Sequence, residues 1–308
     1  MKLPPQIRVI ERGWLSSNSI LAFEGIGNDE ATVVDSGYAG HGERTVELLR
    51  AALDGRRLTR LINTHSHSDH IGGNALIKRS FGCRIVIPAG IEAHVRTWDE
   101  EALLLGPAHQ RGERFVHDAV IAAGDRFEMG GLAWQAVAAP GHDMDALAFH
   151  CPEQRLLISG DALWQDGFGI IFGELLGRPG ALAATRQTLE AFARLDVETV
   201  IPGHGAPFTD VAAALERAFR RLAAFEEDPK RMARNAIKAC FVFNLLDLGR
   251  LPASELAAHL AAVPLFRDVG SRRLGMAPDA LAAWLLGELT AAGAVTVEDG
   301  FLVPKMAA

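Results

Sequence analysis

The amino-acid sequence predicts a mixed α and β fold, in which a layered β-sheet core is covered by helices and followed by a smaller, mostly helical part. Short β-branched runs alternate with patterns of helical spacing from Ile20 to Ile201. From Val211 the chain changes to Ala- and Leu-rich segments with almost no strand signal. Sheets covered by helices would bury the apolar runs of the first part. We therefore expect a larger domain over residues 1–210 and a helical domain over residues 211–308.

The elements of the first part follow from periodicity and from turn-forming residues. Strands are expected over residues 20–23, 31–34, 58–62, 84–87, 132–138, 147–150, 156–158 and 199–201, and helices over residues 45–53, 74–81 and 182–195. A turn is expected at residues 25–29, where two glycines stand beside Asn28 and Asp29. The stretch from Asp99 to Asp118 has no clear periodicity, and we interpret it as a mobile flap.

The second part ends with a helix followed by a hairpin. Asp228-Pro229 predicts a break between two helices, and Gly249 with Pro252 marks another boundary. A helix is expected over residues 280–292, and Asp299-Gly300 separates two β-prone runs, which predicts a hairpin. This order is typical of the end of a winged-helix module. A likeness of shape does not establish nucleic-acid binding, and packing on the larger domain or a homodimer contact fits it as well.

The charge of the chain disfavours a nucleic-acid partner. The 308 residues carry a net charge of −7, and 49% of them are hydrophobic, which is typical of a globular protein. Residues 1–210 hold 19 Lys and Arg against 27 Asp and Glu, whereas residues 211–308 hold 12 against 11. Neither part forms a strongly basic surface by composition. Two local basic patches remain open, and they contain Arg217, Arg220 and Arg221, and Lys230, Arg231, Arg234 and Lys238.

The cysteines and the apolar runs favour a soluble cytoplasmic protein. Cys83, Cys151 and Cys240 lie far apart and no Cys-x-x-Cys is present, so neither a disulfide framework nor a thiolate zinc site is indicated. The first residues lack the apolar core of a signal peptide. No apolar stretch approaches the length that spans a bilayer, so we expect no membrane partner.

The segment from Thr64 to Gly73 carries the strongest chemical signal. His65, His67, Asp69 and His70 fall within six residues at the end of an expected strand. Neutral imidazole and carboxylate groups suit zinc, iron or manganese. Alternate residues of an extended stretch share a face, so the first two histidines can approach one metal ion. A turn after them would direct the other two residues at a neighbouring ion.

Three later residues complete a set of seven whose types and order suit a two-metal site. His142, Asp161 and His204 each follow an expected strand, and each has a glycine beside it that allows close backbone approach. Their positions at the mouths of apolar runs are those expected of ligand loops.

The combined pattern resembles that of the metallo-β-lactamase fold superfamily, and most of all its glyoxalase II and lactonase-type hydrolases. The family motif His-x-His-x-Asp-His matches residues 65–70, and the later His, Asp and His match His142, Asp161 and His204. An early Asp at a strand end matches Asp35. The resemblance covers roughly residues 7–210. It implies an α/β (α+β) fold built as an αββα sandwich with the metals at one edge, which makes residues 1–210 the catalytic domain. Residues 211–308, which lie outside the resemblance, are expected to form a helical, winged-helix-like C-terminal domain from their own pattern.

The resemblance also implies a role for each residue. His65, His67 and His142 would bind one metal, Asp69, His70 and His204 would bind the second, and Asp161 would bridge the two, with Asp35 steadying the ligand loops from behind. The implied cofactor is a pair of divalent metal ions, with zinc favoured and iron or manganese as alternatives. Asp69 would also act in catalysis by orienting the nucleophile and passing a proton to the leaving group.

Departures from relatives narrow the function. Class B1 β-lactamases have a cysteine at the position of Asp161, and flavodiiron relatives have an acid at the position of His67, so both functions are disfavoured. We therefore expect a binuclear hydrolase that attacks an ester, thioester or lactone of a small molecule with a metal-bridging hydroxide.

The substrate pocket and three alternative functions complete the prediction. Trp164, Phe168 and Phe172, in the loop after Asp161, are candidates for the wall of an apolar acyl pocket, with packing in the core as the alternative. Tyr38 is a further candidate for substrate binding, with a place in the turn after Asp35 as the alternative. A metal-dependent nuclease (phosphodiesterase) and an iron-dependent enzyme like persulfide dioxygenase remain open. So does a DNA-binding regulator that uses the C-terminal module.

Overall fold

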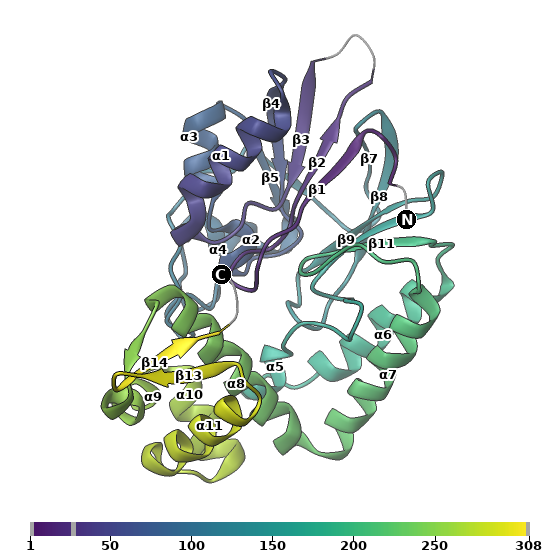
Figure 1. The fold of residues 1–308 in the computed structure, drawn as a ribbon. Helices are drawn as coiled ribbons and strands as arrows, with labels where there is room; N and C mark the ends of the chain where they lie inside the picture. Colours follow the sequence, from purple (N-terminus) through teal and green to yellow (C-terminus); the bar gives the residue numbers. More distant parts are fainter. Residues whose placement is uncertain (1–2, 26–28, 306–308) are drawn as a thin grey trace.

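Two β-sheets lie face to face, and helices cover the outer face of each sheet (Figure 1). The computed structural model describes residues 3–25 and 29–305, so residues 26–28 of the turn expected at 25–29 lie outside the described residues. The mixed α and β class and the helical C-terminal part that the sequence predicts are confirmed.

The first sheet contains six strands, four of which the sequence predicts in place. Its order is β1 (Ile7–Ile10), β2 (Ser19–Phe23), β3 (Glu30–Val34), β4 (Arg57–Ile62), β5 (Arg84–Pro88) and β6 (Ala119–Ile121). Strands β1 to β3 pair in antiparallel fashion, and β3 to β6 are parallel. Period-two alternation divides the buried side chains between two cores, because successive residues of a strand point to opposite faces. Val33 and Leu61 belong to the core under the helices, whereas Val34 and Ile62 belong to the core between the sheets.

The second sheet contains five strands and shares that inner core. Its order is β11 (Thr199–Pro202), β10 (Leu156–Gly160), β9 (Leu147–Cys151), β8 (Leu132–Ala138) and β7 (Arg126–Met129). The pairs are antiparallel except for β10 with β11. Trp134, Phe149 and Ile158 point toward the first sheet, and Leu157 and Val200 point outward. The parallel pair brings the carboxyl ends of β10 and β11 to the same edge.

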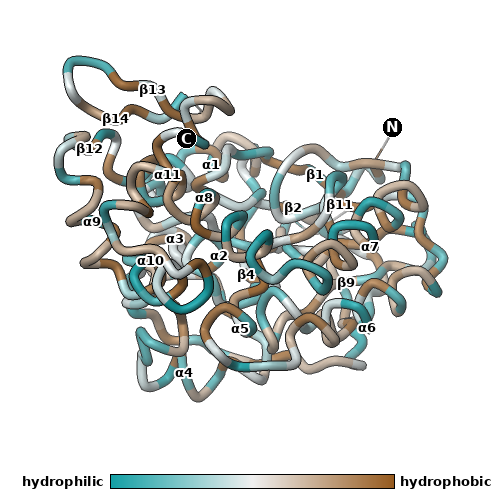
Figure 2. The backbone as a smooth tube through the Cα atoms, turned by 90° about the horizontal axis from the view of Figure 1, so that it is seen from below, coloured by the Kyte–Doolittle hydropathy of each residue, from teal (hydrophilic) through white to brown (hydrophobic). Residues whose placement is uncertain are grey.

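Helices on both sides complete four layers. They are α1 (Gly42–Leu53), α2 (Ser68–Ile71), α3 (Asn74–Phe81) and α4 (Glu92–Thr97) on the first half, and α5 (Phe172–Leu175), α6 (Ala181–Arg194) and α7 (Val211–Glu227) on the second. In α6 and α7 apolar and polar residues alternate along the tube, as expected for helices with one buried face (Figure 2).

The C-terminal part consists of helices and a small sheet. Its elements are α8 (Pro229–Leu248), β12 (Leu251–Pro252), α9 (Leu256–Ala262), α10 (Pro264–Val269), α11 (Pro278–Ala291), β13 (Val295–Glu298) and β14 (Phe301–Pro304). Asp228 caps α8 by accepting a hydrogen bond from the amide of Lys230 at 2.9 Å, and Pro229 occupies its first turn. The predicted hairpin is present, and β12 joins it to make a three-stranded sheet.

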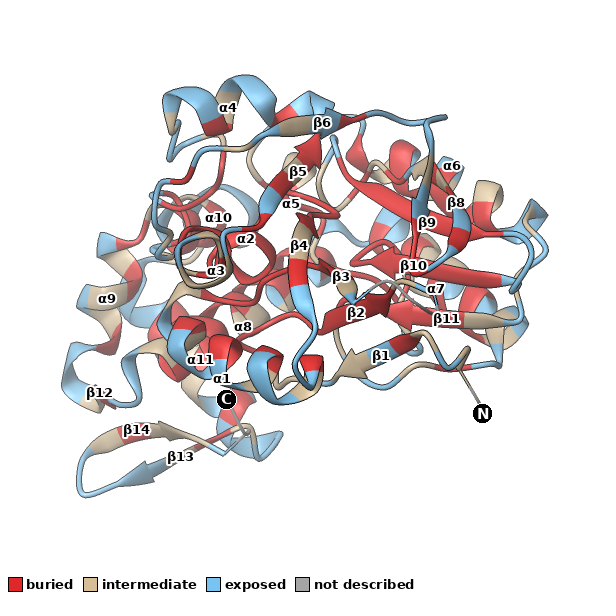
Figure 3. Ribbon diagram, turned by 90° about the horizontal axis from the view of Figure 1, so that it is seen from above, coloured by how far each residue is buried: buried red, intermediate tan, exposed pale blue. Residues whose placement is uncertain are grey.

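Helix α8 connects the two parts of the molecule. A single hydrophobic core cluster includes Phe192 of α6, Leu222 of α7, Phe241 of α8 and Leu285 of α11. Buried residues, red in Figure 3, accordingly continue from the sheets into the C-terminal helices. The division at residue 210 stays a prediction, because this core crosses it.

The segment from Asp99 to Asp118 is anchored rather than loose. Leu103, Leu104 and Leu105 are buried, and Asn244 of α8 donates a hydrogen bond to the carbonyl of Ala108 at 3.1 Å. The sequence prediction missed this because irregular turns bury these leucines without a periodic pattern. Among the described residues, no helix is long and apolar enough to cross a membrane.

Candidate metal centre

Seven histidine and aspartate side chains meet at one edge of the two sheets. His65 and His67 lie in the loop after β4, and Asp69 and His70 lie in α2 directly behind it. The remaining three lie in loops after β8, β10 and β11, and they are His142, Asp161 and His204. The donor loops approach one another so closely that a glycine is required beside the donor residues. A Cβ at Gly203, for example, would collide with Asp161 Oδ1. The backbone is therefore shaped to let these loops converge.

The seven residues form two groups of donor atoms. In each group the donor atoms lie within 4.8 Å of one another, and the groups are His65, His67 and His142, and Asp69, His70, Asp161 and His204. These are the residues that the sequence assigns to two metal ions.

Three imidazoles of the first group direct one nitrogen each toward a common point. His67 Nδ1 lies 2.6 Å from His142 Nε2. The other nitrogen of His142, Nδ1, lies 2.6 Å from the carbonyl oxygen of Ile170 and must donate to it, because a carbonyl can only accept. That bond leaves Nε2 of His142 with a free lone pair. His65 Nδ1 lies 3.0 Å from Thr64 Oγ1, while its Nε2 is buried without a partner among the described residues.

The second group combines two imidazoles with two carboxylates. His204 Nε2 lies 2.9 Å from Asp69 Oδ2. His70 Nε2 lies 3.4 Å from Asp161 Oδ1 and 3.7 Å from Asp69 Oδ2. All four side chains are largely buried, and the most exposed of them, that of Asp69, is 13% accessible. Their charges therefore act in a poorly hydrated environment.

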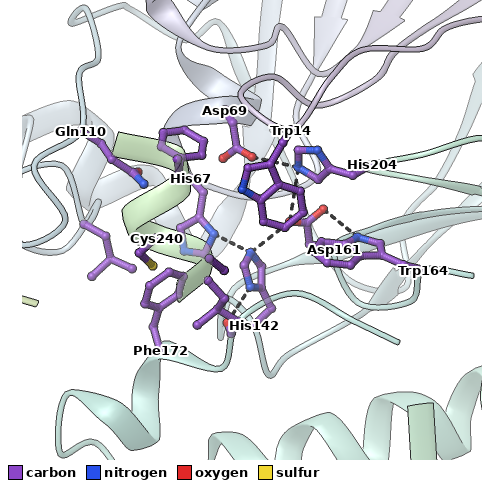
Figure 4. A pocket seen from close by; sticks show the side chains of 14 residues that line it. Trp14, His67, Asp69, Gln110, His142, Asp161, Trp164, Phe172, His204 and Cys240 are labelled. Atoms are coloured by element: carbon purple, nitrogen blue, oxygen red, sulfur yellow. Dashed lines mark hydrogen bonds and ion pairs between the residues drawn. The ribbon is translucent and has the colours of Figure 1, made fainter. Parts of the chain in front are cut away.

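Asp161 contacts both groups. Its Oδ2 lies 3.3 Å from His142 Nε2 of the first group, whereas its Oδ1 lies 3.4 Å from His70 Nε2 of the second. Trp164 Nε1 donates a hydrogen bond of 3.2 Å to the same Oδ1. Figure 4 shows this carboxylate between His142 and His204. The geometry is that of a carboxylate able to bridge two ions.

Asp35 supports the second group from behind. Its Oδ2 accepts hydrogen bonds from His70 Nδ1 and from Thr64 Oγ1, both at 2.8 Å, and its Oδ1 accepts one from the amide of Thr64 at 2.9 Å. The bond from His70 fixes the proton on Nδ1 and leaves Nε2 as a donor of a lone pair. Asp35 adopts a left-handed φ of 60°, a strained conformation that the surrounding hydrogen bonds maintain.

The electrostatics of His65, His67 and Asp161 favour protonation states that bind cations. Burial, followed by the neighbouring imidazoles of His70 and His67, lowers the pKa of His65 well below its usual range. Burial and His142 lower the pKa of His67 to about 4. Burial raises the pKa of Asp161, but His70 and His204 outweigh it and the net shift is well downward. At neutral pH the imidazoles of His65 and His67 are therefore neutral and the carboxylate of Asp161 is ionised. For His70 and His204 burial lowers the pKa, but neighbouring carboxylates, chiefly Asp35 for His70 and Asp161 for His204, outweigh it and raise the pKa of both.

The donor set fits two divalent metal ions. His65 Nε2 and His70 Nε2 are buried polar atoms without a hydrogen-bond partner among the described residues. Buried polar atoms are normally satisfied, so such a group calls for a ligand. Lone pairs of imidazole and oxygens of carboxylate are suitable ligands for zinc, iron or manganese. Divalent metals are the cofactors that this set implies.

A pocket opens beside the two groups. Its walls, besides five of the seven residues, are formed by Trp14, Leu104, Gln110, Trp164, Ile170, Phe172, Ala239, Cys240 and Phe243. The ring of Phe172 lies 5.1 Å from that of His67, and the rings of Trp14 and Trp164 lie 5.3 Å and 5.6 Å from that of His204. The mostly apolar wall suits a small molecule with an apolar part.

Two of the four candidate residues for the pocket lie elsewhere. Tyr38 is fully buried and donates its hydroxyl to Asp247 Oδ2 at 3.0 Å, with its ring against Phe243. It therefore lies behind a pocket residue instead of in the pocket wall, because the turn after Asp35 directs it toward α8. Phe168 is buried under the guanidinium of Arg221 and belongs to the outer layer. Trp164 and Phe172, the other two candidates, line the pocket.

Several residues of the site have no clear signal in the sequence. Trp14 lies in the loop between β1 and β2, where nothing but an aromatic ring beside Gly13 distinguishes it. Cys240 and Phe243 lie in α8. The continuous apolar run in the middle of this helix indicates that it is buried on more than one face, but it does not point to a site. Asp143 accepts hydrogen bonds from the amide and hydroxyl of Ser66 at 3.0 and 2.6 Å, and it thereby holds the loop between His65 and His67.

Comparison with curated proteins identifies relatives of the first part of the chain. The hydroxyacylglutathione hydrolase of Cereibacter sphaeroides (strain ATCC 17023) is 30% identical over 192 residues, which are 62% of this chain and 63% of that protein. The hydroxyacylglutathione hydrolase of Hyphomonas neptunium is 32% identical over 115 residues, which are 37% of this chain and 38% of that protein. The chain thus matches less than two thirds of the length of these relatives.

Solved structures share the fold. A metallo-β-lactamase family protein from Thermus thermophilus has a TM-score of 0.59 at 21% identity, covering 99% of this chain and all of that one. The FEZ-1 metallo-β-lactamase from Legionella gormanii has a TM-score of 0.58 at 14% identity, covering 74% and 94%. At these identities the likeness concerns the fold alone.

A family model places the chain among known proteins. The model of the metallo-β-lactamase superfamily matches residues 12–204, which is more than half of the chain and contains all seven donor residues. The order of the motif, the sandwich fold and the two donor groups agree with this match. The chain belongs to the metallo-β-lactamase superfamily.

Proposed function

We propose that this protein is a binuclear metal-dependent hydrolase that cleaves an ester, thioester or lactone of a small molecule. The observation that carries the proposal is the contact of Asp161 with both donor groups, beside a pocket with apolar walls. The relatives named hydroxyacylglutathione hydrolase support cleavage of an acyl group, and they make a thioester the first substrate to test. Zinc is the proposed metal, because imidazole and carboxylate donors of this kind commonly bind it.

The residues around the pocket suggest how the reaction proceeds. Two divalent ions held by the donor groups would lower the pKa of a water molecule and polarise the acyl oxygen of the substrate. Burial raises the pKa of Asp69, but His70 and His204 outweigh it and lower the pKa, so the carboxylate is ionised at neutral pH. As an ionised carboxylate beside the donors, Asp69 can accept a proton from the attacking water. It can then return this proton to the leaving group. Trp14, Trp164 and Phe172 exclude water from the acyl group and hold it beside the donors.

Two further carboxylates, those of Asp143 and Asp35, hold the histidine loop in place. Asp143 fixes the backbone at Ser66, and Asp35 fixes the ring of His70. Neither lines the pocket, so both act by positioning donor residues.

The proposal is tested by a substrate panel with the metal content measured on the same sample. The panel contains acyl thioesters, esters, lactones, a phosphodiester and a β-lactam. We expect hydrolysis of a thioester, ester or lactone that a chelator abolishes and zinc restores. Faster cleavage of the phosphodiester would favour a nuclease instead. Oxygen consumption by an iron-loaded sample with a persulfide would favour a dioxygenase, and either result would overturn the proposal.

A further inference from the structure

Helices α7 and α8 meet at a corner in the lower part of Figure 1. A basic cleft is formed by side chains of these two helices. It is an open cleft, lined by Arg221, Phe225, Asp228, Arg231, Arg234, Asn235 and Lys238. The sequence shows two separate basic patches, and the turn between the helices brings members of both together. This concentration of positive charge contrasts with the net charge of −7 of the whole chain.

Most of these cations have no carboxylate partner in the part of the chain that the structure describes. Among the described residues, no carboxylate lies within ion-pair distance of Arg221, Arg231 or Arg234. Lys238 Nζ pairs with Glu288 at 3.0 Å. The one acid that lines the cleft is Asp228, whose Oδ1 accepts the capping hydrogen bond from the amide of Lys230. The cleft therefore holds more positive charge than the protein itself neutralises.

Arg221 is the most constrained of these residues. It is half-buried, and its guanidinium lies 5.2 Å from the ring centre of Phe168 and 5.3 Å from that of Phe225. Burial lowers the pKa of Arg221, and the charge of Arg231 lowers it further. Stacking on two rings holds the guanidinium plane while its N–H donors form no hydrogen bond with the described residues. A guanidinium held in this way is prepared to bind an anion with little loss of side-chain entropy.

The cleft lies against the wall of the metal pocket. A Cβ at Gly167 would be 2.9 Å from Arg221 Nη1, so the guanidinium packs on the backbone of that loop. The carbonyl of Gly167 in turn accepts a hydrogen bond of 2.7 Å from the amide of Trp164, which lines the metal pocket. On the other side, Lys238 directly precedes Ala239 and Cys240 of the pocket wall. The cleft and the pocket thus share the loop after Asp161 and the middle of α8.

We propose that the cleft between α7 and α8 binds a phosphoryl group, and preferentially a dianion or polyanion such as a diphosphate. The planar fork of arginine matches phosphate oxygens in a bidentate manner, and three unpaired guanidiniums exceed what one carboxylate can neutralise. The phosphoryl group is either part of a separate small molecule or the tail of the substrate. The second case rests on the proposed hydrolase function.

Binding of inorganic pyrophosphate to the metal-loaded protein tests the site directly. Calorimetry is carried out with the wild type, with Arg221→Gln, with Arg234→Gln, and with the double variant. We expect binding to the wild type and an affinity about tenfold or more weaker in the double variant, since each substitution removes charge-assisted hydrogen bonds. Arg234 is exposed, so Arg234→Gln keeps the test valid if Arg221→Gln loses stability.

Arg220→Gln is the matched control. Arg220 neighbours Arg221 on α7 but is exposed, pairs with Glu216 at 3.4 Å and does not line the cleft. Its affinity for pyrophosphate should equal that of the wild type. Failure of the wild type to bind pyrophosphate would overturn the proposal. Equal binding by the double variant would also overturn it, because the anion would then bind at the metal donors.

A pair of thioesters distinguishes the two sources of the phosphoryl group. S-acetyl phosphopantetheine and S-acetyl pantetheine differ only in the phosphate. If the phosphate belongs to the substrate, the ratio of kcat/KM for the two should fall about tenfold in the double variant and stay unchanged in Arg220→Gln. If neither thioester is cleaved, the hydrolase proposal fails for thioesters while the pyrophosphate measurement still decides the anion site. Tighter binding of a single-stranded oligonucleotide than of pyrophosphate would assign the cleft to nucleic acid and overturn the proposal.

Discussion

Asp35 Oδ2 accepts a hydrogen bond of 2.8 Å from His70 Nδ1, and this bond orients the ring of a metal-donor histidine from outside the pocket. The relationship joins the end of β3 to α2. It explains why a strained φ of 60° is retained at a residue that touches no substrate.

Asp35→Asn should weaken metal binding at the second donor group about 10- to 100-fold, as loss of such supporting carboxylates usually does. Asparagine tolerates the left-handed backbone, so the substitution removes charge without breaking the turn. Competition with a chelator measures the affinity. Asp54→Asn is the control, because Asp54 also has a positive φ, 51°, but is exposed at the end of α1. Equal affinities in both variants would refute the positioning role.

Asp161→Asn should lower the metal content and reduce hydrolysis to less than about one percent, because the bridge between the donor groups loses its charge. Circular dichroism should remain that of a folded protein. Asp166→Asn, five residues further along and exposed, should retain both metal and activity. Survival of a tenth or more of the activity in Asp161→Asn would rule out a bridging role.

Tyr38 is the single tyrosine of the chain, so titration of its hydroxyl with pH reports on the contact between Tyr38 and Asp247. Burial and the charge of Asp247 raise the pKa of Tyr38 to about 12 from an ordinary value near 10. Because the folded-state pKa is raised, the stability linked to it is present below pH about 10 and is lost as pH rises toward 12. Ultraviolet absorbance of tyrosinate measures this titration. In Asp247→Asn the midpoint should fall, whereas an ordinary midpoint in the folded wild type would contradict the buried hydrogen bond.

Trp14→Ala should raise the KM of an acyl substrate about tenfold while leaving the metal content unchanged, because Trp14 forms a wall of the pocket and is not a donor. Steady-state kinetics and metal analysis on one sample separate the two effects. Trp98→Ala is the control, since Trp98 packs against Phe115 and lines no wall of the metal pocket. A loss of metal in Trp14→Ala would contradict a role in substrate binding.

The ligand set could be predicted from the sequence because its chemistry is local. His65 to His70 form a continuous motif, and the three later donors follow strands that their apolar runs identify. The strands β1, β6 and β7 were not predicted, since each is short and two of them carry charged residues. Strand β6 pairs with β5, which lies far away in the sequence, whereas β1 and β7 pair with the strands that follow them, β2 and β8.

The pocket could be predicted only in part, because its walls come from distant segments. Trp164 follows Asp161 closely and is therefore a candidate, whereas Trp14 and Phe243 reach the site through packing that no local pattern encodes. Closeness to Asp35 in the sequence makes Tyr38 a candidate for the pocket, but its hydrogen bond to Asp247 shows that the side chain points toward α8 instead. A homodimer and a cytoplasmic location stay predictions.

The central claim is that two donor groups of this chain hold two divalent metal ions, and metal content per chain tests it most directly. The wild-type protein, loaded with zinc and dialysed, should contain two equivalents, and His142→Ala and His204→Ala should each contain one or fewer, since each removes a donor from a different group. One equivalent or less in the wild type, or two equivalents retained in both variants, would contradict the account.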